Sequence, residues 1–319
     1  MRIAVLDDYQ GVALEMADWG SLGEEITVFR ETVTDHAKLV AQLSPFGIVC
    51  LMRERTPFPA RLMEALPNLR LIVTTGPRNL AIDLEAARKR GITVCGTGSR
   101  KTSTSELAMT MILALSRRIL PEALSMRDGG WQVGLGRDLA GLTLGLVGLG
   151  TIGAQMSRLG QAFGMEVAAW SQNLTEARCA ELGVRRMESL TALMAASDAV
   201  SVHLVLSDRT RGLIGREAFA AMREGAIFVN TSRAPIADTQ ALVEGLRAGR
   251  PAMVGLDVYD VEPLPADDPL RDRALIDEGR LLLTPHIGYV TEATWRVFYT
   301  ETVEAIAAWK AGAPVRVLA

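Results

Sequence analysis

Leu142-Thr-Leu-Gly-Leu-Val-Gly-Leu-Gly-Thr-Ile-Gly153 is the stretch that decides the fold. Its first half is apolar and typical of a buried β-strand, and its second half places glycines at 148, 150 and 153, where a helix is predicted to begin. A Gly-x-Gly-x-x-Gly that joins a strand to a helix lets the chain turn tightly and brings backbone N–H groups close to a pyrophosphate. The pattern therefore favours a dinucleotide-binding site over a plain glycine turn. It is too short and too rich in glycine to span a membrane.

Alternating strand and helix signals extend in both directions from this stretch. Repeated strand–helix units indicate parallel sheets with helices on both faces. After residue 141 the predicted strands are 142–147, 167–170, 199–203, 226–230, 253–258 and 281–284, and the predicted helices are 152–163, 175–182 and 236–248. Before residue 101 the predicted strands are 3–6, 26–29, 48–51, 71–74 and 92–95, and the predicted helices are 37–43 and 84–90. The fold class is therefore α/β, with two doubly wound parallel-sheet domains.

Two longer helices are predicted to connect these parts. Residues 104–120 predict a helix that leads into the second domain, with Pro121 after it. Residues 292–311 predict a last helix that returns to the first domain, where residues 315–318 can rejoin it. At 319 residues the chain exceeds the size at which a single core usually stops growing, so two domains are expected.

Charge and cysteine content exclude several classes of protein. A formal net charge of −3 at pH 7 gives no basic surface for nucleic acid or an anionic membrane. Cys50, Cys95 and Cys179 are odd in number and form no Cys-x-x-Cys pair, which argues against a disulfide framework and a metal site. No signal peptide is recognised ahead of the first strand, so a cytoplasmic location is expected.

Side chains that suit redox chemistry follow three of the predicted strands. Arg233 follows strand 226–230, Glu262 follows strand 253–258, and His286 follows strand 281–284. Ligands of such sheets bind beyond the carboxyl ends of the strands, so these side chains are expected beside the dinucleotide. Each alone has an ordinary alternative. Arg233 could pair with Asp238, Glu262 could be a loop carboxylate, and His286 could be a structural histidine. Their joint occurrence favours catalysis.

Together the three groups suit hydride transfer to a carbonyl. The ordinary pKa of histidine, about 6.5, lets His286 give a proton to the carbonyl oxygen. Glu262 can hold the imidazole in one tautomer and favour its charged form. Arg233 can grip a carboxylate in two places and polarise the adjacent carbonyl. The predicted substrate is a small 2-keto acid or, in reverse, its 2-hydroxy acid.

These motifs resemble those of the D-isomer-specific 2-hydroxyacid dehydrogenase family over nearly the whole chain. The likeness rests on Gly141 to Gly153, Asn230-Thr-Ser-Arg233, Asp257 to Pro263, and Thr284-Pro-His-Ile-Gly288. It implies an NAD(P)-dependent dehydrogenase with Arg233, Glu262 and His286 as catalytic residues and Asp257 on the nicotinamide carboxamide. The implied cofactor-binding residues are Thr104, Gly148, Gly150, Thr151, Ile152, Gly153, Ser171, His203, Thr231, Ser232, Asp257 and Gly288.

The resemblance also implies how the domains are divided. Residues 1–100 and 286–319 are expected to form a discontinuous, flavodoxin-like substrate domain, and residues 101–285 a Rossmann-type NAD(P)-binding domain. Relatives are usually homodimers paired through the nucleotide-binding domain. Residues 129–136 are the expected contact arm.

One departure from the family concerns the choice of cofactor. The family usually ends its second nucleotide-domain strand with Asp, which binds the adenosine ribose hydroxyls, but Ser171 stands there in this chain. No carboxylate is present to repel a 2′-phosphate, and no arginine directly follows Ser171 to bind one. Arg178 lies a turn or more into the next helix. NAD is favoured and NADP stays open.

A second departure concerns the substrate loop. The family's carboxylate-binding loop is matched by Thr75-Gly-Pro-Arg-Asn79, where Arg78 replaces a usual glycine. Arg78 or Asn79 is expected to add a polar contact, and Tyr289 to narrow the pocket. A surface ion pair is the alternative for Arg53 and Arg78. The predicted substrate-binding residues are Arg53, Gly76, Pro77, Arg78, Arg233 and His286.

Two other functions stay in view. A corepressor-type protein that senses NAD(H) uses the same scaffold, and fold alone does not decide between it and an enzyme. Formate-type oxidation is disfavoured because the histidine partner there is normally an amide, whereas Glu262 is an acid.

Overall fold

The computed structural model describes residues 1–319 and divides them into two compact units. Unit 1 consists of Met1–Arg100 and Val290–Ala319, and unit 2 of Lys101–Tyr289. The chain returns to unit 1 at Val290, whereas the return was expected at residue 286. His286 therefore lies in the same unit as Arg233 and Glu262.

Unit 1 is built on a parallel sheet of five strands. The strands are β1 (Arg2–Val5), β2 (Glu25–Val28), β3 (Ile48–Leu51), β4 (Leu71–Thr74) and β5 (Thr93–Gly96). Their order, β2-β1-β3-β4-β5, is the flavodoxin-like order that was predicted. As also predicted, the chain end rejoins this unit: Leu318 N–H donates to Val94 O at 2.7 Å, and Cys95 and Val317 form an antiparallel bridge.

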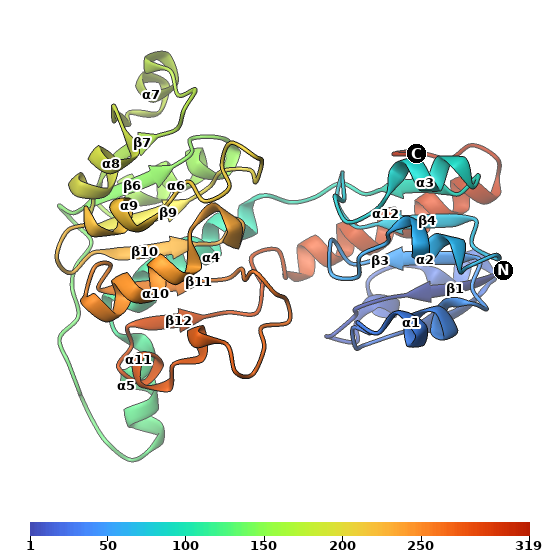
Figure 1. The fold of residues 1–319 in the computed structure, drawn as a ribbon, viewed down its shortest axis with the longest axis horizontal. Helices are drawn as coiled ribbons and strands as arrows, with labels where there is room; N and C mark the ends of the chain where they lie inside the picture. The colour runs from blue at the N-terminus through green and yellow to red at the C-terminus, as the bar shows by residue number, and fades with distance from the viewer. The chain divides into compact units, whose positions relative to one another are not determined.

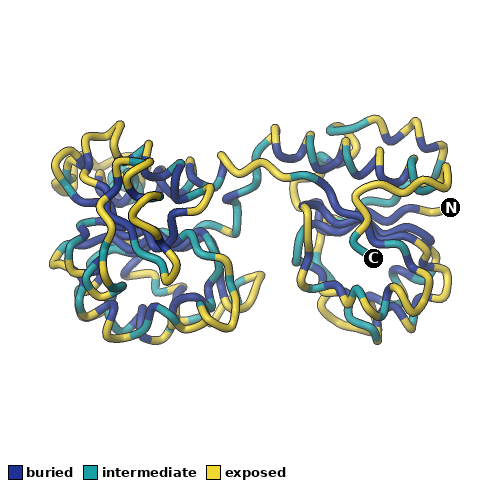
Figure 2. The backbone as a smooth tube through the Cα atoms, turned by 90° about the horizontal axis from the view of Figure 1, so that it is seen from above, coloured by how far each residue is buried: buried dark blue, intermediate teal, exposed yellow.

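Helices cover both faces of this sheet. One core combines alternate strand residues such as Val49 and Leu51 with apolar side chains of α1 (His36–Leu43), α2 (Ala60–Glu64) and α3 (Leu84–Lys89). The long α12 (Glu292–Lys310) packs on β4 and β5 and buries Trp295, Phe298 and Tyr299. Figure 2 shows the buried strands in the middle of the unit, with helices on either side whose outer turns are exposed. Two 3-10 helices, Ala13–Glu15 and Trp19–Leu22, precede β2.

Unit 2 is built on a parallel sheet of seven strands. The strands are β6 (Thr143–Val147), β7 (Glu166–Trp170), β8 (Arg185–Arg186), β9 (Ala199–Val202), β10 (Ile227–Asn230), β11 (Met253–Leu256) and β12 (Leu281–Leu283). Their order is β12-β11-β10-β9-β6-β7-β8. The order reverses beside β6, which is the Rossmann switch point at which such sheets bind ligands.

Two apolar cores sandwich the sheet of unit 2. Leu144 and Leu146 of β6 point to the first core, whereas Val147 points to the second core, on the opposite face of the sheet. On that other face Phe219 packs edge-on against Phe228 of β10, with ring centroids 5.2 Å apart. The first core is formed with α4 (Thr102–Ser116), α6 (Thr151–Ala162) and α7 (Glu176–Leu182). The second core is formed with α8 (Leu190–Ala196), α9 (Arg216–Ala220), α10 (Thr239–Ala248) and α11 (Arg273–Asp277). Unit 2 also contains two 3-10 helices, Ala234–Ile236 and Pro269–Arg271.

The prediction of one helix over residues 104–120 was wrong. α4 ends at Ser116, Arg118 takes a left-handed conformation with φ of 54°, and α5 (Ile119–Arg127) begins directly afterwards. Pro121 lies in the first turn of α5 rather than after a helix. A proline is tolerated there because the first turn of a helix has no partner for its N–H groups.

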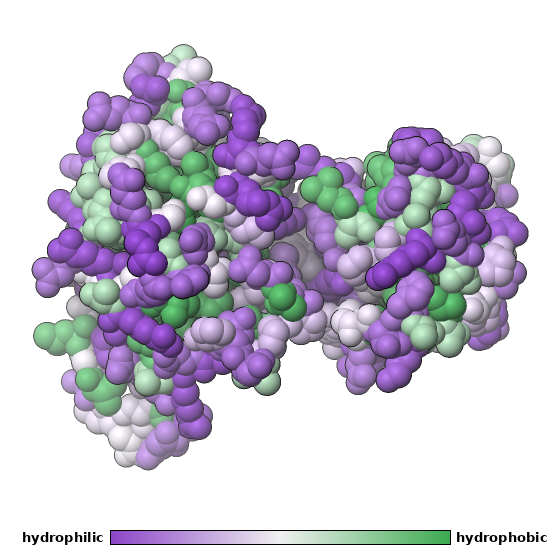
Figure 3. Space-filling view, viewed as in Figure 1, coloured by the Kyte–Doolittle hydropathy of each residue, from purple (hydrophilic) through white to green (hydrophobic).

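α5 and residues 128–138 together form a segment, hereafter the projection, that extends from the sheet of unit 2 (Figure 1). Apolar side chains on it face solvent: Trp131 is 70% exposed and Leu135 is 95% exposed. Figure 3 shows hydrophobic side chains on this part of the surface. No helix of either unit combines the length and the apolar character needed to cross a bilayer.

Candidate active site

The glycine loop after β6 provides a cradle of backbone N–H groups. Gly148 has a φ of 104°, and a Cβ there would lie 2.9 Å from the carbonyl oxygen of His203. A Cβ on Gly153 would lie 2.2 Å from the carbonyl oxygen of Gly148, so the turn requires glycine at both positions. A Cβ on Gly150 would meet nothing within 4 Å. Gly150 is the N-cap of α6 and makes no side-chain cap, so the first N–H groups of the helix, from Thr151 and Ile152, stay available to a phosphate.

Buried polar atoms without a partner follow the two neighbouring strands β9 and β10. His203 Nε2 and Thr231 Oγ1 have no hydrogen-bond partner within the protein. Burial lowers the pKa of His203 to about 3, so its imidazole is neutral at ordinary pH. Such atoms cost about 1–3 kcal/mol each unless a ligand pairs with them. Together with the glycine cradle, they fit a bound dinucleotide.

Ser232, predicted to line the same site, is engaged within the protein. Its hydroxyl donates to the carbonyl oxygen of Leu204, and its N–H donates to Asn230 Oδ1 at 3.0 Å. Ser171 directly follows β7, where Gly148 N–H donates to the carbonyl oxygen of Trp170 at 2.9 Å. The structure thus places Ser171 beside the glycine loop.

Asp257 organises the loop that follows β12. Its buried carboxylate accepts hydrogen bonds from Thr284 Oγ1 at 2.5 Å, Ile287 N–H at 2.7 Å and Gly288 N–H at 2.7 Å. Burial raises the pKa of Asp257, although these hydrogen bonds and the charge of His286 oppose the rise. A carboxylate accepts about four hydrogen bonds, so capacity is left for the predicted contact with a carboxamide. Thr104 Oγ1 donates to Gly288 O at 3.1 Å and ties α4 to the same loop.

His286 and Glu262 are directly paired. His286 Nδ1 lies 2.6 Å from Glu262 Oε2, and Glu262 Oε1 accepts a hydrogen bond from Tyr259 N–H at 2.9 Å. Burial raises the pKa of Glu262, but the hydrogen bond with His286, the charge of that ring, the Tyr259 N–H and the charge of Arg233 outweigh it. Its net pKa is lowered. The two side chains are 24% and 32% exposed, so solvent reaches the pair.

Arg233 belongs to the same cluster through its charge. It caps the 3-10 helix that follows β10, and its Nη1 donates to Ser232 O at 2.8 Å. β10, β11 and β12 are neighbours in the sheet, so their carboxyl ends deliver Arg233, Glu262 and His286 to one rim. Tyr289 packs edge-on against His286, with ring centroids 5.4 Å apart.

The loop of residues 75–79 lies in unit 1 and is shaped by Arg53. The Arg53 side chain covers Gly76 so closely that a Cβ on Gly76 would lie 1.7 Å from Arg53 Nη1. Gly76 N–H is already bound to Thr97 Oγ1 at 2.7 Å, and Pro77 has no N–H, so neither of these two residues offers a free backbone donor. Arg78 is exposed.

Asn79, considered for a polar contact with the substrate, is engaged within its own loop. Its amide donates to Arg53 O at 2.6 Å and to Thr74 Oγ1 at 2.9 Å, and its Oδ1 accepts from Ala81 N–H at 2.9 Å. The buried side chain therefore holds the loop together. The roles of Thr284 and Thr97 were not predicted from the sequence, although Thr284 begins the motif Thr284-Pro-His-Ile-Gly288.

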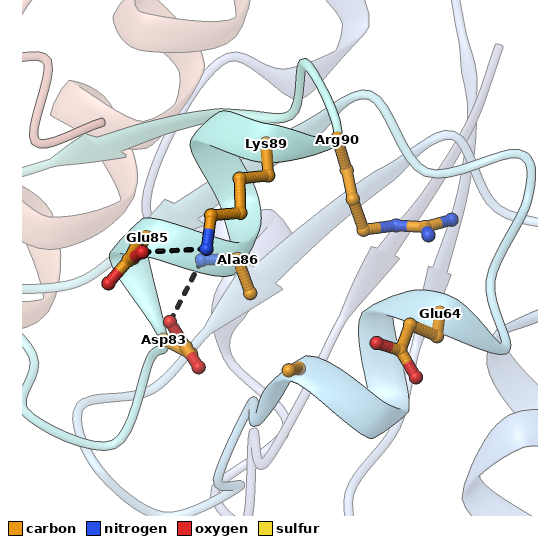
Figure 4. Close-up of a pocket in the computed structure, with 7 residues that line it drawn as sticks. Glu64, Asp83, Glu85, Ala86, Lys89 and Arg90 are labelled. Carbon is orange, nitrogen blue, oxygen red and sulfur yellow. Dashed lines mark hydrogen bonds and ion pairs between the residues drawn. The ribbon is translucent and has the colours of Figure 1, made fainter.

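A separate hollow of about 280 Å³ opens between α2 and α3 (Figure 4). Lys89 pairs with Glu85 at 2.7 Å, and Asp83 caps α3 through Ala86 N–H. No residue of the predicted site lines this hollow, and its neighbouring charges resemble a solvated surface. Neither unit contains a cluster of three or more His, Cys, Asp or Glu side chains able to hold a metal ion.

Comparison with known proteins places this geometry in context. Residues 109–288 match the family model described as "D-isomer specific 2-hydroxyacid dehydrogenase, NAD binding domain". The chain is 37% identical to a hydroxypyruvate reductase of Thermotoga maritima, over 86% of this chain and 90% of that protein. It is 35% identical to a glyoxylate reductase of Korarchaeum cryptofilum, over 80% and 77% respectively. It superposes on a phosphoglycerate oxidoreductase of Vibrio cholerae with a TM-score of 0.92 and 34% identity, over 98% of this chain and all of that one.

Proposed function

This chain belongs to the D-isomer specific 2-hydroxyacid dehydrogenase family, and from that premise we propose that it reduces a small 2-keto acid, or oxidises the D-2-hydroxy acid, with His286 as the proton-transferring group. Family membership makes it an NAD-dependent oxidoreductase. The identity of the substrate and the roles of the residues are what the proposal adds.

The proposed chemistry divides between cofactor and side chains. The nicotinamide ring supplies the hydride when NADH is bound. As the carbonyl carbon gains the hydride, its oxygen gains negative charge and takes a proton from His286. Because Nδ1 is engaged by Glu262, Nε2 is the nitrogen that donates. Glu262, ionised because its pKa is lowered, orients the ring and favours its protonated form. In the oxidation direction the same nitrogen accepts the hydroxyl proton.

Arg233 is proposed to bind the substrate carboxylate and polarise the carbonyl next to it. Its guanidinium is a planar fork that can donate two parallel hydrogen bonds to a carboxylate. The same charge helps keep Glu262 ionised. Arg53, Gly76, Pro77 and Arg78 of unit 1 are proposed to add substrate contacts, with the exposed Arg78 as the second cation.

The cofactor is proposed to lie along the carboxyl ends of the strands of unit 2. Its pyrophosphate would be held by the N–H groups near Gly150, Thr151, Ile152 and Gly153. The unpaired His203 and Thr231 are proposed to meet it. Toward the nicotinamide, the proposed contacts are Thr104, Asp257 and Gly288.

The single observation that carries the proposal is the 2.6 Å contact between His286 Nδ1 and Glu262 Oε2. The test follows the loss of NADH absorbance with glyoxylate, hydroxypyruvate and other small 2-keto acids. At least one of them is expected to oxidise NADH, and His286→Gln is expected to lower kcat by about 100-fold or more, since general acid catalysis contributes about that much. His36→Gln, at the exposed start of α1, is the control. Wild-type kcat in His286→Gln would refute the assignment.

Nothing in the comparisons supports the corepressor-type alternative, since the relatives are named as reductases and an oxidoreductase.

We further propose that the chain forms a homodimer through the projection, whose exposed Trp131 and Leu135 need a partner surface. The three cysteines are unpaired and buried, which suits a reducing, cytoplasmic compartment.

A further inference from the structure

The turn after β7 lies at the adenosine end of the proposed cofactor site. Leu174 N–H donates to Ser171 O at 3.1 Å, which closes a turn over residues 171–174. The bond between Gly148 N–H and Trp170 O brings this turn against the glycine loop. In sheets of this kind a carboxylate at this strand end binds the ribose hydroxyls of NAD, whereas a nearby arginine accommodates the 2′-phosphate of NADP. Ser171, Gln172 and Asn173 supply no carboxylate.

An arginine reaches this place from further along the chain. Arg178, on α7, donates from Nε to the carbonyl oxygen of Leu149 at 3.4 Å. Leu149 is the residue between Gly148 and Gly150, so the guanidinium lies on the glycine loop itself. From the sequence, Arg178 was expected to lie a turn or more into the next helix and therefore away from Ser171.

The guanidinium is held but not fully occupied by its acidic neighbour. Arg178 Nη1 pairs with Glu181 at 2.7 Å, and the two side chains are 35% and 62% exposed. Exposed ion pairs of this kind are weak, so a phosphate dianion can compete for the cation. The other acid of α7, Glu176, is already paired with Arg186 at 3.1 Å.

We propose that Arg178, with the turn at Ser171, binds a phosphate on the adenosine ribose, so that the enzyme accepts NADPH as well as NADH. The inference rests on the proposed cofactor site in unit 2. Arg178 would contact the 2′-phosphate. Ser171 carries no negative charge, so it would not repel that phosphate.

The test measures binding of two adenosine fragments to the full chain by calorimetry, without substrate or turnover. The wild type is expected to bind 2′,5′-ADP at least as tightly as 5′-AMP. Arg178→Ala is expected to weaken 2′,5′-ADP by about tenfold or more and to leave 5′-AMP unchanged, because one charge-assisted contact is lost. Arg158→Ala, which removes an exposed arginine from α6, is the control for net charge.

Two further variants keep the proposal falsifiable if Arg178→Ala does not fold. Ser171→Asp should lose 2′,5′-ADP while keeping 5′-AMP, and Glu181→Gln should bind 2′,5′-ADP more tightly because the competing carboxylate is gone. Equal loss of both fragments in Arg178→Ala, or a wild type that binds 5′-AMP but not 2′,5′-ADP, overturns the NADPH inference and leaves the proposed function standing. A wild type that binds neither fragment overturns both.

Discussion

His286 carries its imidazole on a backbone that few residues adopt. Its φ is 53°, a left-handed conformation that is unfavourable for a residue with a side chain, and its N–H donates to Thr284 O at 2.9 Å. Asp257 holds the same loop through three hydrogen bonds to Thr284, Ile287 and Gly288. The strained position is therefore maintained by a buried carboxylate, and its benefit is that the ring meets Glu262.

At the residue scale, the Glu262→Gln variant tests whether Glu262 acts by orienting the His286 ring or by its negative charge. The amide can still accept a hydrogen bond from Nδ1, but the negative charge is lost. A charge-assisted hydrogen bond is worth about 1.5–3 kcal/mol, so we expect kcat for keto-acid reduction to fall roughly 10- to 100-fold. A kcat for Glu262→Gln equal to that of the wild type would contradict the role of Glu262.

The same variant is also expected to differ from the wild type in how its unfolding free energy depends on pH. The fold lowers the pKa of Glu262 below its ordinary value of 4.5. The ionised carboxylate therefore stabilises the protein fully above that pH, and its contribution is lost as pH falls through the lower folded-state pKa. The difference in unfolding free energy between wild type and Glu262→Gln should accordingly shrink in acid, as chemical denaturation at several pH values would show.

At the scale of elements, the β6–α6 junction uses neighbouring glycines for different reasons. Gly153→Ala would force a Cβ to within 2.2 Å of the carbonyl oxygen of Gly148. We expect a loss of about 1–3 kcal/mol in unfolding free energy, because the backbone must shift to admit the methyl group. NADH binding should weaken as a consequence of the same shift.

Gly150→Ala is the matched variant. Its φ of −75° suits alanine, and the new Cβ meets no protein atom within 4 Å, so stability should be unchanged. The methyl group would nevertheless occupy the space assigned to the pyrophosphate, and NADH affinity should fall. Thermal denaturation and fluorescence titration of NADH measure the two effects, and unchanged NADH affinity in Gly150→Ala would argue against the cradle.

At the scale of the whole molecule, the projection bears on assembly. We expect the wild type to have the mass of two chains in light scattering, and Leu135→Glu to have the mass of one, because a charge would replace an exposed apolar contact. Leu80→Glu is the matched control, since Leu80 of unit 1 is also largely exposed, at 80%. A wild type that is monomeric at micromolar concentration would refute the dimer.

The sequence by itself determined the α/β class, most strands and which side chains follow the strands at the rim of unit 2. Strands 48–51 and 71–74 were predicted at the residues where they occur, because apolar runs between turn residues are local signals. Local signals were insufficient where elements are short: α2, α9 and α11 have only five residues each and were not predicted. The break between α4 and α5 was missed because Pro121 marks a helix start as well as an end.

Only the tertiary structure decided which distant groups meet. Arg178 reaches Leu149 across 29 positions, and Asp257 reaches Gly288 across 31. Asn79 proved to be a loop-forming residue because its partners come from the turn after β3 and from the end of β4 as well as from its own loop. Motifs show which chemistry a chain carries, since they depend on neighbours in sequence. Which side chains remain for a ligand depends on contacts that form only when the strands are side by side.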